Sequence, residues 1–183
     1  MSELLRFDGV ALRRGGRLLF ENLDLALGPG ERLQVTGTNG SGKSSLIRLA
    51  AGLLSAERGT VERARCALAD DSPALDRELP LRRALRLWGK RTDGAMEALG
   101  VAHLADVPVR LLSSGQLKRA TLARVAASGA ALWLLDEPLN ALDRDGAERL
   151  ATAVARHVES GGAVLAASHQ PLPGEWPALE LGR

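Results

Sequence analysis

The chain has 183 residues, of which 45% are hydrophobic, and its 24 basic and 22 acidic residues leave a net charge of +2. This composition excludes disorder and collagen-like repeats, and it is typical of one globular domain with a sizeable core. The longest charge-free stretches, 125–135 and 160–174, are too short or too broken by Gly and Pro to supply the roughly 20 apolar residues that cross a bilayer. We therefore expect no direct membrane insertion.

The amino-terminal residues and the cysteine content indicate the compartment. Glu3, Arg6 and Asp8 stand where a signal peptide needs an apolar core, and Cys66 is the only cysteine. Both facts fit a reducing cytoplasm. Aromatic residues make up 3% of the chain, tyrosine is absent and the basic residues are dispersed, so nucleic acid is not an expected partner.

The first part of the chain has the pattern of β-strands. Residues 4–12 and 23–27 carry apolar side chains at alternating positions, which is typical of half-exposed strands. Residues 28–30, Gly-Pro-Gly, predict a turn, and the apolar Leu33 and Val35 follow. These patterns predict a small antiparallel sheet that leads into a buried strand.

The pattern changes to helical spacing after Lys43 and continues to Leu54, with Gly59 as the expected stop. Residues 81–112 also have apolar side chains at helical spacing, with breaks at Gly89, Gly100 and Pro108. We therefore expect a mostly helical middle third.

Two short apolar runs, 131–135 and 163–167, flank a helical pattern over 147–158. Such runs predict two buried parallel strands joined by a crossover helix. Because no internal repeat or linker divides the sequence, we expect a single domain over residues 1–183.

Residues 37–44, Gly-Thr-Asn-Gly-Ser-Gly-Lys-Ser, match the phosphate-binding loop pattern and lie between a predicted strand and a predicted helix. Glycines permit the positive φ angles that turn backbone NH groups toward phosphate oxygens, and the helix presents its positive end to the same anion. Lys43 would neutralise the β and γ phosphates, and the Ser44 hydroxyl would bind Mg²⁺. The residues expected to bind nucleotide here are Gly37, Thr38, Asn39, Gly40, Ser41, Gly42, Lys43, Ser44 and Ser45.

The apolar run that begins at Ala131 ends in two carboxylates, Asp136 and Glu137, before Pro138. Asp136 is the expected second ligand of Mg²⁺, and Glu137 is expected to orient and deprotonate the water that attacks the γ-phosphate. A pair of solvated loop acids is the alternative interpretation, which the phosphate-binding loop upstream makes less favourable.

These motifs, with three more, resemble those of the ATP-binding-cassette (ABC) ATPases over almost the whole chain. The further motifs are Leu-Ser-Ser-Gly-Gln at 112–116, Asn-Ala-Leu-Asp at 140–143 and Ser-His at 168–169. The resemblance implies ATP hydrolysis and an α/β P-loop NTPase fold. That fold has a mostly parallel core sheet, an N-terminal antiparallel β subdomain and a short helical subdomain, inserted at roughly 72–118.

The resemblance also implies a head-to-tail homodimer, in which each ATP lies between the phosphate-binding loop of one subunit and residues 112–116 of the other. Ser113 and Gly115 precede a helical pattern, so their NH groups would join a positive helix end facing the γ-phosphate. Ser113, Gly115 and Gln116 are therefore expected nucleotide contacts. An ordinary serine-capped helix is the alternative.

By the same resemblance, His169 contacts the γ-phosphate and helps to position the attacking water, whereas a lone histidine is more often structural. Asp143 would link the two active sites of the dimer, although a helix cap before Ala147 explains it nearly as well.

The sequence departs from the family at two places. The family usually stacks an aromatic ring on adenine, and Arg14 stands at the corresponding spacing; its guanidinium plane would stack on the base, or it is a solvated surface residue. The family's metal-contacting glutamine is not evident, and Asp70 or Asp71 occupies the expected place. A carboxylate there would bind Mg²⁺ through water or slow turnover.

Within the family, the segments 136–143 and 168–172 and the small size resemble the ATP-binding subunits of bacterial haem exporters in cytochrome c maturation. That resemblance implies a peripheral subunit on the cytoplasmic side of the inner membrane, in complex with integral membrane subunits of the CcmB, CcmC and CcmD type. It implies ATP and Mg²⁺ as ligands, and haem export or haem-chaperone release as the work performed. Two alternatives stay open: the ATPase subunit of another small-substrate transporter, and a soluble ATP-dependent dimerisation switch with weak hydrolysis.

Overall fold

The computed structural model describes residues 3–182 and contains two β-sheets. The antiparallel sheet has the strand order β2-β1-β4, with bounds β1 Leu5–Arg14, β2 Arg17–Leu27 and β4 Arg58–Arg63. The second sheet has the order β5-β6-β7-β3-β8, and every neighbouring pair in it is parallel. Its strands are β3 Arg32–Thr36, β5 Cys66–Ala69, β6 Leu132–Asp136, β7 Ala163–Ala167 and β8 Ala178–Glu180.

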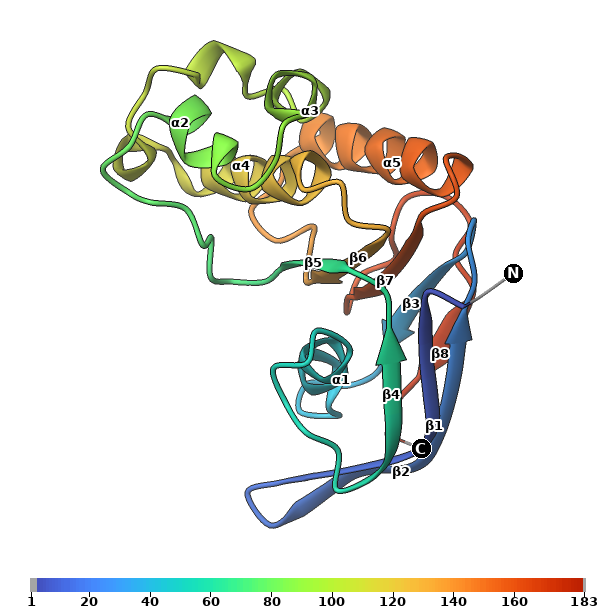
Figure 1. The fold of residues 1–183 in the computed structure, drawn as a ribbon. Helices are drawn as coiled ribbons and strands as arrows, with labels where there is room; N and C mark the ends of the chain where they lie inside the picture. The colour runs from blue at the N-terminus through green and yellow to red at the C-terminus, as the bar shows by residue number, and fades with distance from the viewer. Residues whose placement is uncertain (1–2, 183) are drawn as a thin grey trace.

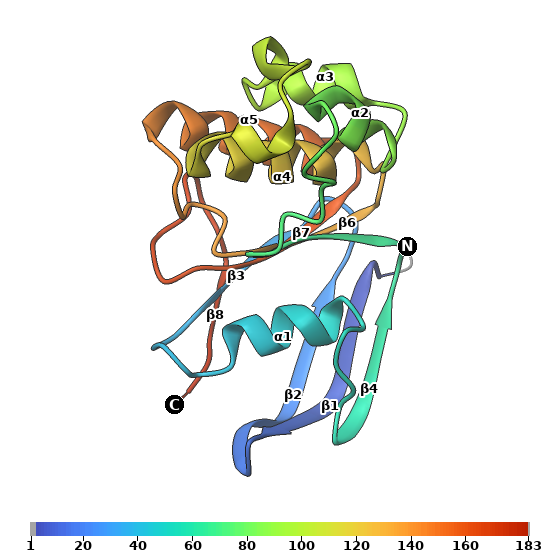
Figure 2. The ribbon, with the colours of Figure 1, turned by 90° about the vertical axis from the view of Figure 1, so that its left-hand side faces the viewer.

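The helices cover both faces of the parallel sheet (Figures 1 and 2). Helix α1, Lys43–Ala50, lies between the two sheets, whereas α4, Ser114–Ala127, and α5, Arg144–Glu159, cover the opposite face. The short helices α2, Leu81–Arg86, and α3, Thr92–Ala98, lie against α4, and two 3₁₀ turns follow at 102–104 and 109–111. The expected combination of a parallel core sheet, an antiparallel sheet and a helical segment is confirmed.

Strand β6 shows how the core forms, because its alternate side chains enter two different apolar clusters. Leu132 and Leu134 pack with α1 and the antiparallel sheet. Trp133 and Leu135 pack with α4, α5 and the short helices on the other face. Both faces are therefore buried, which explains the continuous apolar run that predicted the strand.

Helix α1 ends earlier than the sequence pattern predicts. We expected a stop at Gly59, but α1 ends at Ala50, and Gly59 lies in β4. The residue that ends α1 is Gly52, with φ +73°: the NH of Leu53 donates to the carbonyl of Arg48, and the NH of Gly52 to that of Leu49. This is a glycine C-cap, which stops the helix although the apolar spacing continues.

The middle third is helical only in short pieces, because its glycines and proline interrupt the helices as expected. Strands β4, β5 and β8 were not predicted. β4 is mostly exposed and β8 has three residues, so neither leaves a strong apolar pattern. The expected domain limits also include residues 1, 2 and 183, which lie outside the described residues.

The carboxyl-terminal half of α5 is fixed to β6 by an aromatic pair. The ring of His157 stacks on Trp133 with centroids 4.0 Å apart and an interplanar angle of 9°. Nε2 of His157 lies 3.1 Å from the carbonyl oxygen of Ala131. A Cβ on Gly162 would lie 2.3 Å from the imidazole, so only glycine fits beside the ring. Burial lowers the pKa of His157 below its usual range, and hydrogen bonds to the carbonyls of Ala131 and Ala163 oppose this.

This lowered pKa predicts a loss of stability on acidification. The unfolded chain takes up the His157 proton near pH 6.5 while the folded chain does not, so stability falls as the pH drops below about 6.5. In His157→Phe, which keeps a stacking ring but cannot titrate, we expect a flatter profile, by up to about 1.4 kcal/mol per pH unit. Chemical denaturation between pH 7.5 and 5 measures this difference. His103→Gln, at an exposed histidine, should keep the wild-type slope; equal slopes for all three proteins would contradict the assignment.

Candidate nucleotide-binding site

The phosphate-binding loop connects the end of β3 to the start of α1. Gly42 caps α1 with φ +108° and no side-chain hydrogen bond, so the first NH groups of the helix have no side-chain cap there. Gly37 has φ +136°, and a Cβ there would lie 2.4 Å from the carbonyl oxygen of Leu181. The fold therefore requires glycine at both ends of this loop.

Two polar side chains of the loop are arranged for an anion. Lys43 is only 7% exposed, and its Nζ donates to the carbonyl oxygens of Gly37 (2.8 Å) and Thr38 (3.2 Å). The hydroxyl of Ser41 is buried, and it has no hydrogen-bond partner among residues 3–182. Phosphate oxygens are acceptors for an ammonium and a hydroxyl, so both groups fit a polyphosphate in this loop.

Ser44 and Asp136 meet although they lie far apart in the sequence. The hydroxyl of Ser44 donates to Oδ1 of Asp136 at 3.0 Å. Burial raises the pKa of Asp136, the neighbouring carboxylates of Glu137 and Asp71 raise it further, and the Ser44 hydrogen bond and Arg48 oppose the rise. Two hard oxygen donors at a phosphate loop fit Mg²⁺, and a cation there would relieve the unfavourable burial of the carboxylate.

Glu137, His169 and Gln170 form a hydrogen-bonded chain. Glu137 has φ +45°, an uncommon angle for this residue, and its NH donates to the carbonyl of Ala167 at 2.8 Å. Nδ1 of His169 lies 2.8 Å from Oε2 of Glu137, and Nε2 of His169 lies 3.2 Å from the amide nitrogen of Gln170. Because an amide nitrogen only donates, Nε2 accepts and Nδ1 carries the proton that it donates to Glu137. The backbone turn at Glu137 and the hydrogen bonds through His169 and Gln170 fix the orientation of the Glu137 carboxylate.

A cavity of about 560 Å³ joins several of the predicted residues, and its volume is ordinary for a small-molecule site. Its lining comprises Arg14, Gly15, Leu19, Asn39, Gly40, Gly42, Lys43, Ser44, Ser45 and Glu137. Asp136 adjoins this lining through Ser44, and His169 adjoins it through Glu137.

Residues 113–116 do not line this cavity. Ser113 caps α4 in a capping box: its hydroxyl accepts from the NH of Gln116 at 3.3 Å, and its own NH donates to the Gln116 side chain at 2.9 Å. Ser113, Gly115 and Gln116 line a separate cavity of about 310 Å³, together with Asp143. One chain therefore holds the two predicted groups of nucleotide contacts in two different places.

Arg119 fixes α4 to the start of α5. Its guanidinium pairs with Asp143 and, at 2.7 Å, with Asp145. Asp143 also caps α5 by accepting from the NH of Gly146 at 2.8 Å, which agrees with the helix-cap interpretation. The pKa of Asp143 lies below its usual range because its carboxylate accepts from the Gly146 NH and pairs with Arg119. The pKa of Asp145 is lowered by hydrogen bonds from Arg149 and Arg119.

Lys118 is a site residue that the sequence analysis missed. It is 9% exposed, and its Nζ donates to the backbone carbonyl of Asp136 at 3.4 Å. Burial lowers its pKa, and the carboxylates of Asp71, Asp136 and Asp70 oppose the shift. Asp70 and Asp71 follow β5 at the edge where β6 ends. Only its place two residues after Gln116 distinguishes Lys118 in the sequence.

Comparison with known proteins agrees with this geometry. The sequence pattern of the ABC transporter family matches residues 20–140. The solved "Structure of ATP binding subunit of ABC transporter" superposes with a TM-score of 0.83 at 20% identity, covering 91% of this chain and 79% of that one. A nucleotide-free ATP-binding cassette from an ABC transporter gives a TM-score of 0.76 at 20% identity, covering 92% and 82%. At these identities the solved structures show the fold, and the sequence match shows the family: the chain belongs to the ABC transporter family.

Within that family, the chain is similar to proteins named cytochrome c biogenesis ATP-binding export protein CcmA. It is 55% identical over 177 residues to the one from Sphingopyxis alaskensis, covering 92% of this chain and 91% of that protein. It is also 55% identical over 166 residues to the one from Novosphingobium aromaticivorans, covering 89% and 87%. The family resemblance noted in the sequence is therefore confirmed, and so is the closer likeness to the cytochrome c biogenesis group.

Proposed function

We propose that the chain is the ATP-hydrolysing subunit of an ABC transporter in cytochrome c biogenesis, where two copies close around ATP to drive haem export or release of a haem-loaded chaperone. The observation that carries the proposal is the convergence of the loop at 37–44 with Asp136, Glu137 and His169 at one sheet edge. The names of the similar proteins support the biological setting.

The residues at this edge supply the groups that hydrolysis requires. The loop NH groups and Lys43 bind the β and γ phosphates, and Ser44 and Asp136 hold Mg²⁺, which offsets the phosphate charge. Glu137 accepts a proton from water as the water oxygen attacks the γ-phosphorus. The bond between that phosphorus and the leaving β-phosphate oxygen breaks, which gives ADP and phosphate. His169 positions Glu137 and the water beside it.

A second copy completes the site in this proposal. Ser113 and Gly115 lie at the N-terminus of α4, whose positive end attracts the γ-phosphate of the partner's nucleotide. Their place in a cavity separate from the loop at 37–44 supports a head-to-tail arrangement with two equivalent sites. Loss of the γ-phosphate removes this contact and favours the open state.

The variant Glu137→Gln tests the dimer. It keeps the binding groups but removes the proton acceptor, so we expect a stable ATP-dependent dimer in size-exclusion chromatography and at least a hundred-fold lower turnover. The double variant with Lys43→Ala should stay monomeric, because it loses the main phosphate contact. A Glu137→Gln protein that stays monomeric with ATP, even beside its membrane partners, would contradict the proposal.

Arg14 is the proposed contact for the base. It ends β1 and lines the cavity, and its exposed guanidinium is free to stack on adenine because no hydrogen bond or ion pair holds it among residues 3–182. Arg17, at the start of β2, pairs with it across the hairpin but does not line the cavity.

Arg14→Ala should therefore weaken ATP binding by about two- to five-fold, the range of exposed cation contacts, and leave inorganic triphosphate binding nearly unchanged. Isothermal titration calorimetry with both ligands measures the difference. Arg17→Ala is the matched control and should change neither affinity. Equal losses for ATP and triphosphate in Arg14→Ala would support the surface interpretation instead.

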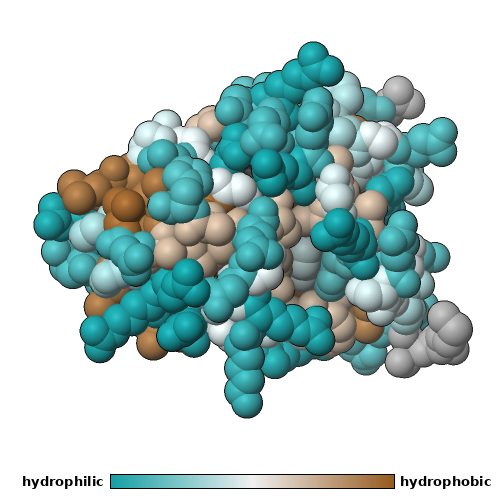
Figure 3. All heavy atoms as spheres, turned by 90° about the horizontal axis from the view of Figure 1, so that it is seen from above, coloured by the Kyte–Doolittle hydropathy of each residue, from teal (hydrophilic) through white to brown (hydrophobic). Residues whose placement is uncertain are grey.

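The proposed docking surface for membrane subunits is the helical segment 81–112. It carries the exposed apolar residues Leu87 (72% exposed), Trp88 (41%) and Leu111 (60%). Figure 3 shows apolar surface gathered at one side of the molecule, the side of α2 and the start of α4, among mostly hydrophilic side chains. Apolar side chains grouped in this way are typical of protein contact surfaces.

Leu87→Glu should lower the amount of CcmB-, CcmC- and CcmD-type subunits that copurify with the tagged chain from co-expressing membranes. Leu53→Glu, at a 62% exposed leucine after α1, is the control and should leave the yield unchanged. Retention of the membrane subunits by Leu87→Glu would remove the segment 81–112 from this role.

The same copurification separates the alternatives. Haem-handling membrane subunits would support the proposed function and a peripheral place on the cytoplasmic side of the inner membrane. Other membrane subunits would indicate a different small-substrate transporter. Recovery of the chain alone would favour a dimerisation switch with weak hydrolysis, for which Asp70 and Asp71 near Asp136 are the supporting residues.

No helix among residues 3–182 is long and apolar enough to cross a bilayer.

A further inference from the structure

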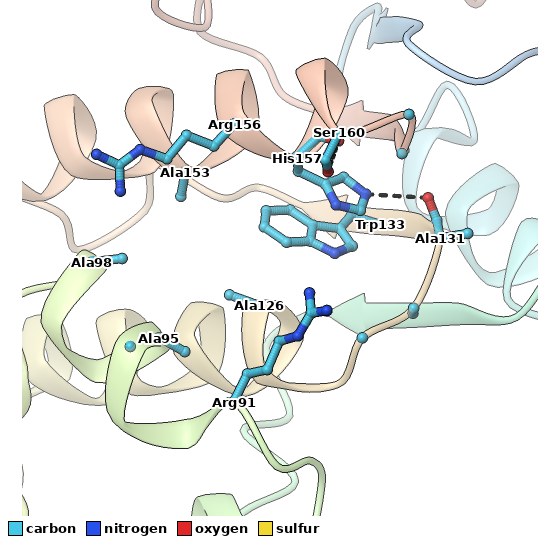
Figure 4. A pocket seen from close by; sticks show the side chains of 15 residues that line it. Arg91, Ala95, Ala98, Ala126, Ala131, Trp133, Ala153, Arg156, His157 and Ser160 are labelled. Atoms are coloured by element: carbon cyan, nitrogen blue, oxygen red, sulfur yellow. Dashed lines mark hydrogen bonds between the residues drawn. The ribbon is translucent and has the colours of Figure 1, made fainter.

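A cavity of about 750 Å³ lies apart from the nucleotide site (Figure 4). It forms at Ala131, just before β6, whereas the nucleotide site forms where β6 ends, at Asp136. Its walls come from α3, the end of α4 and the second half of α5. The two cavities share no lining residue.

The interior of this cavity is mostly apolar, and two stacked rings close its floor. Ala95 and Ala98 of α3 face Ala126 of α4 and Ala153 of α5, and these small side chains leave the hollow between the helices. The stacked rings of His157 and Trp133 form the floor. The backbone NH groups of residues 160–162 are bonded within the turn after α5, so the floor needs no ligand to satisfy them.

The rim carries two positive charges. Arg91, before α3, and Arg156, on α5, line the cavity, and the lining contains no carboxylate. Over residues 3–182, neither guanidinium has an ion pair or a side-chain hydrogen bond, whereas many other arginines pair with acids, such as Arg119, Arg144 and Arg149. Two unpaired cations beside an apolar hollow favour an anion with an apolar body.

We propose that this cavity binds a small aromatic anion, a flat apolar ring system that carries one carboxylate or sulfonate. The volume is in the range of small-molecule sites. The rings fill the space between the alanine walls, and the acid group meets Arg91 and Arg156, whose guanidinium planes also stack on aromatic faces. The site does not depend on the function proposed above, because it shares no residue with the nucleotide cavity.

Two matched dyes test the charge requirement. The anion 8-anilinonaphthalene-1-sulfonate and its neutral analogue N-phenyl-1-naphthylamine have the same apolar body, and both fluoresce on entering an apolar site. The anion should bind the wild type more tightly than the neutral dye. Arg91→Gln and Arg156→Gln should each weaken binding of the anion by about two- to five-fold and leave the neutral dye unchanged. Arg144→Gln, at an exposed arginine at the start of α5, is the control.

Filling the hollow tests the position. Ala98→Leu and Ala126→Leu should abolish binding of both dyes while the thermal unfolding midpoint stays unchanged. Leu87→Ser is the control and should not alter dye binding, because Leu87 lies outside the cavity. Equal affinity of the two dyes would overturn the proposal, as would full binding to the filled variants or displacement of the dye by excess ATP. If a filled variant does not fold, the two arginine variants, which change only exposed side chains, still decide the question.

Discussion

The parallel pairing of β3, β6 and β7 is the constraint on which the nucleotide site depends. Register places Val35 and Asp136 beside the same residue, Ala167, so the three strands end together. The phosphate-binding loop, the two carboxylates and His169 each follow one of these ends. In a parallel sheet the carboxyl ends meet at one edge, which is why residues more than 90 positions apart meet within hydrogen-bond distance. A register shift of one residue would turn the side chain of Asp136 to the other face.

Charged side chains of both signs gather at this edge. The carboxylates attract a cation and Lys43 attracts an anion, so the site can bind both together. The chain has only three lysines, and two of them, Lys43 and Lys118, are buried here. Lys43 donates to carbonyl groups of its own loop, and Lys118 lies among the carboxylates that raise the pKa of Asp136. Within the described part of the chain, neither lysine donates a hydrogen bond to a carboxylate, so polyphosphate oxygens offer Lys43 a stronger partner than its present carbonyl acceptors.

The parts of this arrangement that could be predicted from sequence are those with a local pattern. The loop at 37–44 and the apolar runs before Asp136 and Ser168 are short, contiguous signals, and the structure places all three at one edge. The features that were missed depend on tertiary contact. Gly52 ends α1 through hydrogen bonds that apolar spacing does not encode, and Lys118 belongs to the site because tertiary packing buries its side chain beside Asp136. The cavity at the start of β6 exists because small side chains of α3, α4 and α5 leave space above that strand. Such a space depends on how the elements pack, so it cannot be predicted from the order of residues.

The ion pairs of Arg119 have a mechanical consequence. This side chain, 15% exposed, ties α4 to the turn that begins α5, and Gly115 leaves room for the carbonyl of Ala141 between them. The turn at 112–116, before α4, and the turn at 140–143, before α5, thus form one connected surface instead of two independent loops. Because the carboxylates of Asp143 and Asp145 are exposed, salt weakens these ion pairs as it weakens other surface pairs, and the hydrogen bond from the Gly146 NH to Asp143 adds a contact at the start of α5. A contact made on either turn therefore bears on both, and Lys118, next to Arg119 on α4, extends the connection to the carbonyl oxygen of Asp136.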